Sequence, residues 1–420
     1  MTDAHTVLPW GHEGMRIEGQ RLLVAGRDAE ALAREHGTPQ YVFDLRRIGE
    51  QAGALREALV RAGLTPRVRL AMKALRDEPV LRYLRSLAAP PAADPGVAGG
   101  LIGLDACSPG EVKHALACGF LPREISYTGT NVSERDLDVL APLDLHVNVD
   151  LISQIERVGR RCPGRAVGLR VNPRAGVMRG HAESLYAGAK PTKFGIYKED
   201  LDRALAAAEH HALTIDTAHF HLANGMLDDE LPAFDEALTA AERMVRRMIA
   251  AGCPLEEVNV GGGLGTPLHD SERPLDLDAY AGLLARHFGD LGVAIGAEPG
   301  EFLTNEAGVL PAEVVTVEDR AGTPFVGLDC GWNVLNDHRI YGRELEFVLP
   351  AHADAPPTRF VTVAGHINEG DDVFAEGVRL PEVAEGEIVA FVSIGGYCHS
   401  MWTDHCGRPR AGAVFFADRA

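Results

Sequence analysis

A lysine at the end of an apolar run is the first residue of this sequence that could do covalent chemistry. Lys73 closes the segment Arg67–Lys73 (RVRLAMK), so apolar neighbours would hold it away from water. Burial lowers the pKa of a lysine and frees its amine to form an imine with a carbonyl compound. A lysine that simply leaves a strand for solvent has the same sequence signature, so Lys73 needs partners before it predicts catalysis.

Two later segments could supply such partners, an anion site and a buried acid. The run Gly261–Gly265 (GGGLG) has almost no side chains, so its backbone N–H groups could close on an anion such as a phosphate. Glu298 begins the segment Glu298–Gly300 (EPG) and offers a carboxylate that could keep a ring nitrogen protonated. Taken alone, the glycine run is typical of a tight turn and Glu298 of a salt bridge at a strand end.

A pair of histidines leaves two kinds of site open. His219 and His221 lie two residues apart, so on a strand they share one face, and this spacing is found in metal sites. A metal-dependent hydrolase would need further ligands, and the other strand ends do not offer a complete set. One imidazole could instead lie flat over an aromatic cofactor, with the other histidine structural.

Short apolar runs alternate with helical periodicity and predict parallel strands joined by helices. Eight such runs over about 230 residues favour a closed (β/α)8 TIM barrel, whose reactive groups belong at the C-terminal ends of the strands. An open doubly wound sheet stays possible from counting alone. The runs are Arg67–Lys73, Leu101–Cys107, Ile125–Gly129, Asp144–Asp150, Ala166–Asn172, Thr214–Leu222, Glu257–Gly263 and Gly292–Gly300.

The predicted secondary structure changes after about residue 305. From there on, extended apolar runs follow one another, and few segments between them have helical periodicity. We therefore expect residues 41–304 to form the barrel and residues 305–420 to form a second, β-rich domain. Met15–Ala25 alternates like a hairpin, so residues 1–40 are expected to join that second domain.

Composition excludes several classes of protein. A formal net charge of -19 would repel a nucleic acid, so no such partner is expected. The seven cysteines form no CxxC pair and are expected to stay reduced. Because no apolar stretch approaches the roughly 20 residues of a membrane helix and no secretory signal is visible, we expect no membrane partner and a cytoplasmic location.

Taken in order, these segments resemble the fold-type III, alanine racemase-like enzymes that use pyridoxal 5'-phosphate (PLP), and among them the diaminopimelate and ornithine decarboxylases. The resemblance runs along nearly the whole chain. Besides the segments above, it rests on Tyr41–Asp44, Leu104–Glu111, Leu169–Pro173, Lys193–Gly195, Asp329–Gly331, Tyr341, Asn368-Glu369 with Asp372, and Gly395–Tyr397.

The resemblance implies a role for each matching residue. Lys73 would carry PLP as a Schiff base, His221 would stack on the cofactor ring, and Glu298 would face the pyridine nitrogen. The surroundings of the cofactor phosphate would be Asn224, Gly262, Gly263, Gly300, Glu301 and Tyr397. The family also implies a homodimer with shared active sites, in which Asn368-Glu369 reaches into the neighbouring protomer's site.

Departures from the family pattern bear on the substrate and on proton transfer. Asn368 stands at the catalytic position where these decarboxylases usually carry a proton-donating cysteine, and an amide cannot replace that acid. Glu301 replaces an arginine, which disfavours a substrate with a distal carboxylate unless Arg339 takes over. The predicted substrate residues are Asp337, Arg339, Tyr341 and Glu369.

The leading prediction is therefore a PLP-dependent amino-acid decarboxylase acting on a substrate with a distal amine or guanidine. A PLP-dependent epimerase or racemase is the alternative, because PLP chemistry depends on which bond at Cα is aligned with the ring. A metal-dependent barrel hydrolase and a non-catalytic homologue are the remaining classes.

Overall fold

The computed structural model describes residues 8–87, 102–179, 188, 190–269 and 271–419. The chain forms two compact units, one built from Met1–Ile48, Thr266–Pro274 and Leu303–Ala420, the other from Gly49–Gly265 and Leu275–Phe302. The sequence predicted domain boundaries at residues 41 and 304. These boundaries stay a prediction.

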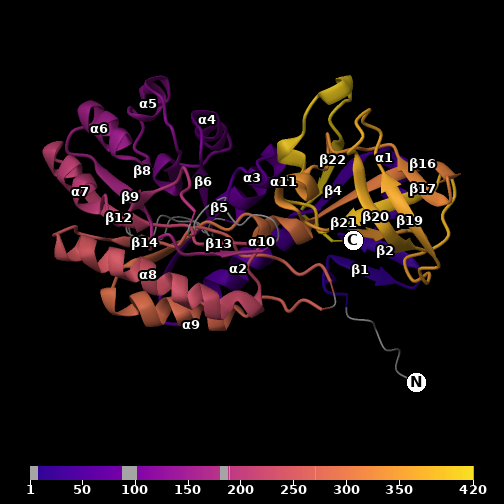
Figure 1. Ribbon diagram of the computed structural model, residues 1–420, viewed down its shortest axis with the longest axis horizontal. Helices are drawn as coiled ribbons and strands as arrows, with labels where there is room; N and C mark the ends of the chain where they lie inside the picture. Colours follow the sequence, from indigo (N-terminus) through magenta and orange to yellow (C-terminus); the bar gives the residue numbers. More distant parts are fainter. Residues whose placement is uncertain (1–7, 88–101, 180–187, 189, 270, 420) are drawn as a thin grey trace. The chain divides into compact units, whose positions relative to one another are not determined.

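The second of these units is a closed barrel of parallel strands (Figure 1). Each strand pairs with its neighbours in chain order, and β15 pairs with β5 to close the ring. The strands are β5 (Thr65–Ala71), β6 (Gly103–Ala106), β7 (Ile125–Thr128), β8 (His146–Val149), β9 (Ala166–Asn172), β12 (Thr214–His219), β14 (Glu257–Asn259) and β15 (Ala294–Ala297). The predicted barrel is confirmed.

Helices alternate with these strands and lie around them in Figure 1. Helix α8 buries Phe234, Leu238, Ala241 and Val245, a spacing of three and four residues that makes one apolar stripe. The helices are α2 (Leu45–Arg61), α3 (Glu78–Ser86), α4 (Pro109–Ala117), α5 (Glu134–Leu140), α6 (Ile152–Arg161), α7 (Leu201–His210), α8 (Leu231–Ala250) and α9 (Leu277–Phe288). None of the helices in the described residues is long and apolar enough to span a membrane.

Short elements extend the C-terminal rim of the barrel, where the loops follow the strands. Strand β10 (Val177–Met178) pairs in parallel with β13 (Ala223–Asn224), and β11 (Ile196–Tyr197) pairs with β9. Helix α10 (Glu301–Thr304) follows β15 directly. Several strands end earlier than the sequence predicted, and Lys73 lies two residues beyond the end of β5. At β14 the reason is local, since Gly261 and Gly263 have positive φ angles that a strand cannot accommodate.

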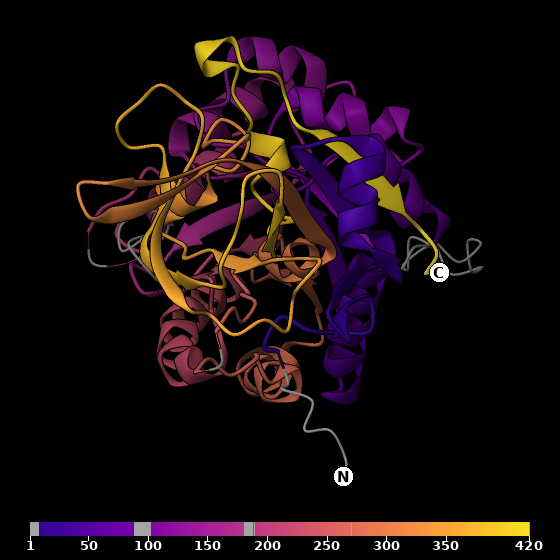
Figure 2. The same cartoon turned by 90° about the vertical axis from the view of Figure 1, so that its right-hand side faces the viewer.

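The other unit is mostly β structure, and its long strands curve across Figure 2. Its larger sheet has the order β18-β21-β16-β17-β19-β20, with β4 pairing both β16 and β22. The strands are β4 (Gln40–Asp44), β16 (Gly308–Arg320), β17 (Thr323–Leu328), β18 (Glu346–Val348), β19 (Arg359–Ala364), β20 (Val373–Leu380), β21 (Ile388–Val392) and β22 (Gly412–Phe416). The predicted second β domain is confirmed.

The N-terminal segment folds into this β-rich unit. Strands β1 (Met15–Glu18) and β2 (Arg21–Val24) form the predicted hairpin, but with β3 (Arg27–Asp28) they make a separate three-stranded sheet instead of adding a strand to the larger one. Trp10, Leu22 and Val24 pack in one core with residues of β4, β16 and β21. Helix α1 (Ala29–His36) follows, and helix α11 (Asp337–Tyr341) lies in the C-terminal half.

Candidate active site

Lys73 lies at the C-terminal rim of the barrel, next to the ends of the neighbouring strands β6 and β15. Met72 N–H donates to the carbonyl of Asp105 at 2.9 Å, and Ala71 N–H donates to the carbonyl of Pro299 at 3.2 Å. These two bonds fix the backbone before Lys73 between β6 and β15. The charge of Lys73 lowers the pKa of His221 and opposes the rise that burial causes in the pKa of Asp105, so the amine lies within electrostatic range of both side chains.

Glu298 is a buried carboxylate held by two side chains. Its Oε2 lies 3.0 Å from His219 Nε2, and its Oε1 accepts a 2.7 Å hydrogen bond from Asn259 Nδ2. Burial by itself would raise the pKa of Glu298, but His219, Arg69 and Asn259 outweigh it and lower that pKa below its usual value. The site therefore contains a fixed negative charge with little access to water.

His221 takes a different place from His219. Its Nδ1 lies 3.1 Å from Gly262 N, which donates to it, so the ring is tied to the glycine loop. Burial lowers the pKa of His221 well below its usual value, and the charges of Lys73 and Arg170 lower it further. The imidazole is thus neutral. Among the described residues, no group of three or more His, Cys, Asp and Glu side chains could hold a metal ion.

The glycine loop forms a cradle that side chains could not share. A Cβ on Gly262 would lie 2.3 Å from the carbonyl oxygen of Glu298, and one on Gly263 would lie 2.0 Å from that of Ala223. Met226 N–H donates to the carbonyl of Gly263 at 2.9 Å, which holds the loop against the segment after β12. A glycine loop without side chains can present its backbone N–H groups to an anion, and a phosphate is the anion usually bound at this place in a β/α barrel.

Two further residues at the rim were missing from the predicted site. Asp105 is buried, its pKa is raised well above the usual value by burial and then by Glu298, and within the described residues its Oδ1 has no hydrogen-bond partner. Arg170 is buried at the end of β9, with its guanidinium 4.5 Å from the centre of the Phe194 ring. Both stand at strand ends, the same position that singled out Lys73 and Glu298, and that signal could have found them.

Of the remaining predicted site residues, Asn224, Gly300 and Glu301 lie in the barrel unit and the others in the β-rich unit. Arg339 Nη2 contacts Asp371 Oδ2 at 2.5 Å, and its guanidinium lies 4.5 Å from the centre of the Trp332 ring. Glu369 Oε1 lies 3.0 Å from His405 Nε2. Both predicted substrate residues thus already have partners of opposite or potentially opposite charge.

Other predicted residues of this unit differ in burial. Asp337 is buried, with Oδ2 3.8 Å from Arg343 Nη1, whereas Asn368 is exposed. The rings of Tyr341 and Tyr397 meet edge to face, with 5.6 Å between their centres. The structure therefore brings these two predicted tyrosines together.

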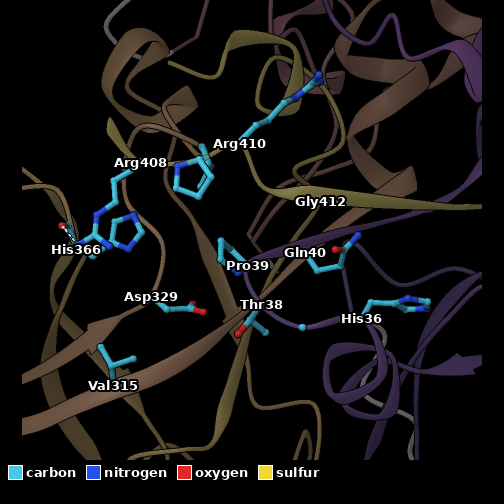
Figure 3. A pocket seen from close by; sticks show the side chains of 13 residues that line it. His36, Thr38, Pro39, Gln40, Val315, Asp329, His366, Arg408, Arg410 and Gly412 are labelled. Carbon is cyan, nitrogen blue, oxygen red and sulfur yellow. Dashed lines mark hydrogen bonds between the residues drawn. The ribbon is translucent and has the colours of Figure 1, made fainter. Parts of the chain in front are cut away.

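A separate cavity lies in the β-rich unit, shown in Figure 3. Its volume is about 530 Å³, and none of the predicted site residues lines it. The lining side chains with polar groups are His36, Thr38, Gln40, Asp329, His366, Arg408 and Arg410.

Comparison with known proteins identifies the barrel. The family described as pyridoxal-dependent decarboxylase, pyridoxal binding domain, matches residues 45–305. The chain belongs to this family. It is 32% identical over 403 residues to the diaminopimelate decarboxylase of Methanothermobacter thermautotrophicus, covering 94% of this chain and 90% of that protein. It is 31% identical to the diaminopimelate decarboxylase of Escherichia coli K12, covering 92% and 90%.

A solved structure agrees with this assignment. The crystal structure of a variant diaminopimelate decarboxylase from Helicobacter pylori, in complex with L-lysine, superposes with a TM-score of 0.81 at 25% identity and covers 93% of this chain and 94% of that one. The predicted family, enzyme class and cofactor are confirmed: this pyridoxal-dependent decarboxylase is an amino-acid decarboxylase that uses PLP. Because the chain belongs to this enzyme family, the hypotheses of a metal-dependent hydrolase and of a non-catalytic homologue are rejected.

Proposed function

We propose that this pyridoxal-dependent decarboxylase removes the α-carboxylate of an amino acid whose side chain ends in an amine or guanidine. The observation that carries the proposal is the state of Arg339, whose charge is met by Asp371 at 2.5 Å and whose face stacks on Trp332. An arginine neutralised in this way has little free charge for a distal carboxylate. Asp337 and Glu369 carry carboxylates, and a distal cation of the substrate would take the place of Arg343 or His405 as their partner.

The rim residues fit the cofactor as a set. Lys73 would hold PLP through its amine, the cradle at Gly262 and Gly263 would receive the phosphate, and the neutral ring of His221 would lie against the cofactor ring. Glu298 would keep a proton on the pyridine nitrogen, because its neighbours hold it anionic. Once bound, PLP supplies an electron sink for the charge left at Cα when carbon dioxide departs.

The experiment is a measurement of released carbon dioxide from a panel of lysine, ornithine, arginine and diaminopimelate, with chiral analysis of the remaining amino acid. We expect release from a substrate with a single distal cation. Inversion at Cα without gas would favour the epimerase alternative and contradict the proposal. Lys73→Ala is the control, and it should be colourless where the wild type absorbs visible light.

Diaminopimelate itself is the second candidate, favoured by the 31–32% identity to diaminopimelate decarboxylases over more than nine-tenths of the chain. Its distal carboxylate would require Arg339 to leave Asp371. Arg339→Gln should then raise KM for diaminopimelate strongly and leave KM for lysine or ornithine within about twofold, since a salt-bridged cation contributes only when it is released. Asp371→Asn should do the opposite, lowering KM for diaminopimelate.

Two expectations about the whole protein stay predictions. We propose a homodimer in which Asn368 and Glu369 reach into the neighbouring protomer's active site, and a cytoplasmic location. The family resemblance supports the homodimer.

A further inference from the structure

An acidic residue lies next to the glycine cradle. Glu301 follows Gly300 and begins α10, and its Oε2 lies 3.8 Å from the point that a Cβ on Gly225 would occupy. Gly225 packs directly against the cradle, because a Cβ on Gly265 would lie 2.5 Å from the carbonyl oxygen of Gly225. A carboxylate at this position would repel a phosphate bound by the cradle, since like charges close together in a low-dielectric site disfavour binding.

An arginine reaches the same point from another part of the rim. Arg179 follows β10, and its backbone N–H donates to the carbonyl of Asn224 at 3.0 Å. Its Cβ and Cδ lie 3.5 and 3.9 Å from the same Cβ position on Gly225. The side chain of Arg179 therefore passes over Gly225, beside the carboxylate of Glu301.

Arg179 and Glu301 meet over Gly225. Its φ angle is +66°, a left-handed conformation that L side chains rarely adopt, and a Cβ there would be in van der Waals contact with both side chains. The arginine and the glutamate therefore lie on two sides of the same point above the backbone of Gly225.

We propose that Arg179 supplies the cation of the cofactor-phosphate site and that Glu301 positions its guanidinium there. The five N–H donors of a guanidinium can serve a carboxylate and a phosphate at once, in a way that a lysine cannot. An arginine between the carboxylate of Glu301 and the cofactor phosphate would cancel the repulsion between them, and the carboxylate would then hold the guanidinium in place for the phosphate. Arg179 is then a cofactor-binding residue, and Glu301 is a positioning residue that acts through it. This assignment rests on the proposed use of the glycine loop as the phosphate site.

The test compares PLP with pyridoxal, which lacks the phosphate, in titrations of the cofactor-free protein followed by visible absorbance. Arg179→Gln should weaken PLP binding by about 10- to 100-fold, as expected for loss of a charge-assisted contact, and leave pyridoxal binding unchanged. Glu301→Gln should weaken PLP binding in the wild type but strengthen it in the Arg179→Gln background, because there only the repulsion remains. Arg174→Gln, on the same segment with an exposed side chain, is the matched control and should bind PLP like the wild type.

The outcomes separate this inference from the proposed site. A wild type that binds PLP no better than pyridoxal would overturn the phosphate site itself. A wild type that prefers PLP, with Arg179→Gln keeping that preference, would overturn only the role of Arg179. Equal weakening of PLP and pyridoxal by Arg179→Gln would also overturn it, since that result indicates damage to the fold, which the unfolding temperature of the cofactor-free variant would reveal.

Discussion

Burial works against the ionisation of Glu298, yet His219 Nε2 lies 3.0 Å from one of its carboxylate oxygens and Asn259 donates to the other. These two partners, with Arg69, hold the pKa of Glu298 below its usual value, so the carboxylate is ionised at neutral pH. Such a fixed charge is what a pyridine nitrogen needs to stay protonated.

Replacing this charge tests its role directly. Glu298→Gln should lower kcat by about 10³-fold, the scale of losing a preorganised electrostatic partner, while the visible band of bound PLP persists. The measurement is kcat together with the absorption spectrum of the purified variant. A rate within tenfold of the wild type would show that Glu298 only holds the strand ends together. His219→Gln, which can still donate to the carboxylate, should have a much smaller effect.

Residues of the site could be predicted from sequence to different degrees. Lys73, His221 and Glu298 lie at the ends of predicted strands, where the barrel fold places reactive groups, so their position made them candidates. Their roles were inferred from the family resemblance and stay predictions. The pairing of Arg339 with Asp371 and its stacking on Trp332 depend on the folded loop around α11, and no spacing in the sequence indicates them.

At the scale of elements, two arginines and one glutamate brace the barrel interior. Arg67 and Arg69 on β5 contact Glu257 on β14 across β15, at 2.8 and 2.5 Å. Gly296 on β15 leaves the space, since a Cβ there would lie 2.1 Å from Glu257 Oε1. Burial would raise the pKa of Glu257, but Arg69 and Arg67 outweigh it and lower that pKa to about 2.

Removing the glutamate should be costly and pH-dependent. Glu257→Gln leaves Arg69 buried without a counter-charge and should lower the free energy of unfolding by about 3–5 kcal/mol at neutral pH. Because the folded-state pKa lies below the usual 4.5, the stabilisation is present above that value and is lost as the pH falls towards 2. Urea unfolding at several pH values would measure this free energy. The control is Glu78→Gln, which removes one partner of the exposed pair of Glu78 with Arg82 and should change the free energy of unfolding little.

A second brace joins the outer helices α8 and α9. His287 Nδ1 lies 2.7 Å from Glu242 Oε2, and its Nε2 lies 2.7 Å from Asp235 Oδ1. Each ring nitrogen thus faces a carboxylate oxygen, one from α8 residue Glu242 and one from α8 residue Asp235, so the ring ties α9 to α8. Its hydrogen bond lowers the pKa of Asp235.

His287→Gln should therefore loosen the contact between α8 and α9. A glutamine cannot satisfy both carboxylates at these distances, and we expect a loss of about 1–3 kcal/mol in unfolding free energy, as for broken hydrogen bonds to charged groups. Hydrogen exchange should accelerate in these two helices first. His352→Gln, at an exposed position, is the control, and equal effects of both substitutions would contradict the brace.

At the scale of the whole molecule, the proposed homodimer can be tested by complementation. Lys73→Ala and Glu369→Ala should each be inactive if both residues serve the reaction. If the two residues meet across protomers, mixed dimers contain one intact site, and a refolded equal mixture should recover up to about a quarter of wild-type activity. No recovery, in a mixture that sedimentation shows to be dimeric, would place both residues in the same protomer's site.

The two units also differ in how far the sequence predicted them. Barrel strands buried on both faces read as continuous apolar runs, so the strands could be predicted, and their number favoured a closed ring over an open sheet. Strand β4 pairs with β22 at the opposite end of the chain, and such a pairing has no local signature. The separate sheet of the N-terminal hairpin was missed for the same reason, because its place is set by the Trp10 core.

Apart from the closing pair of β15 with β5, each barrel strand lies beside the barrel strands before and after it in the chain, and this order has an evolutionary consequence. Each β/α unit holds its place through the adjoining units, so a rim loop can be exchanged by recombination without rewiring the remainder. Lineages descended from this barrel would therefore change which amino acid they consume by inheriting new loops on an unchanged order of strands.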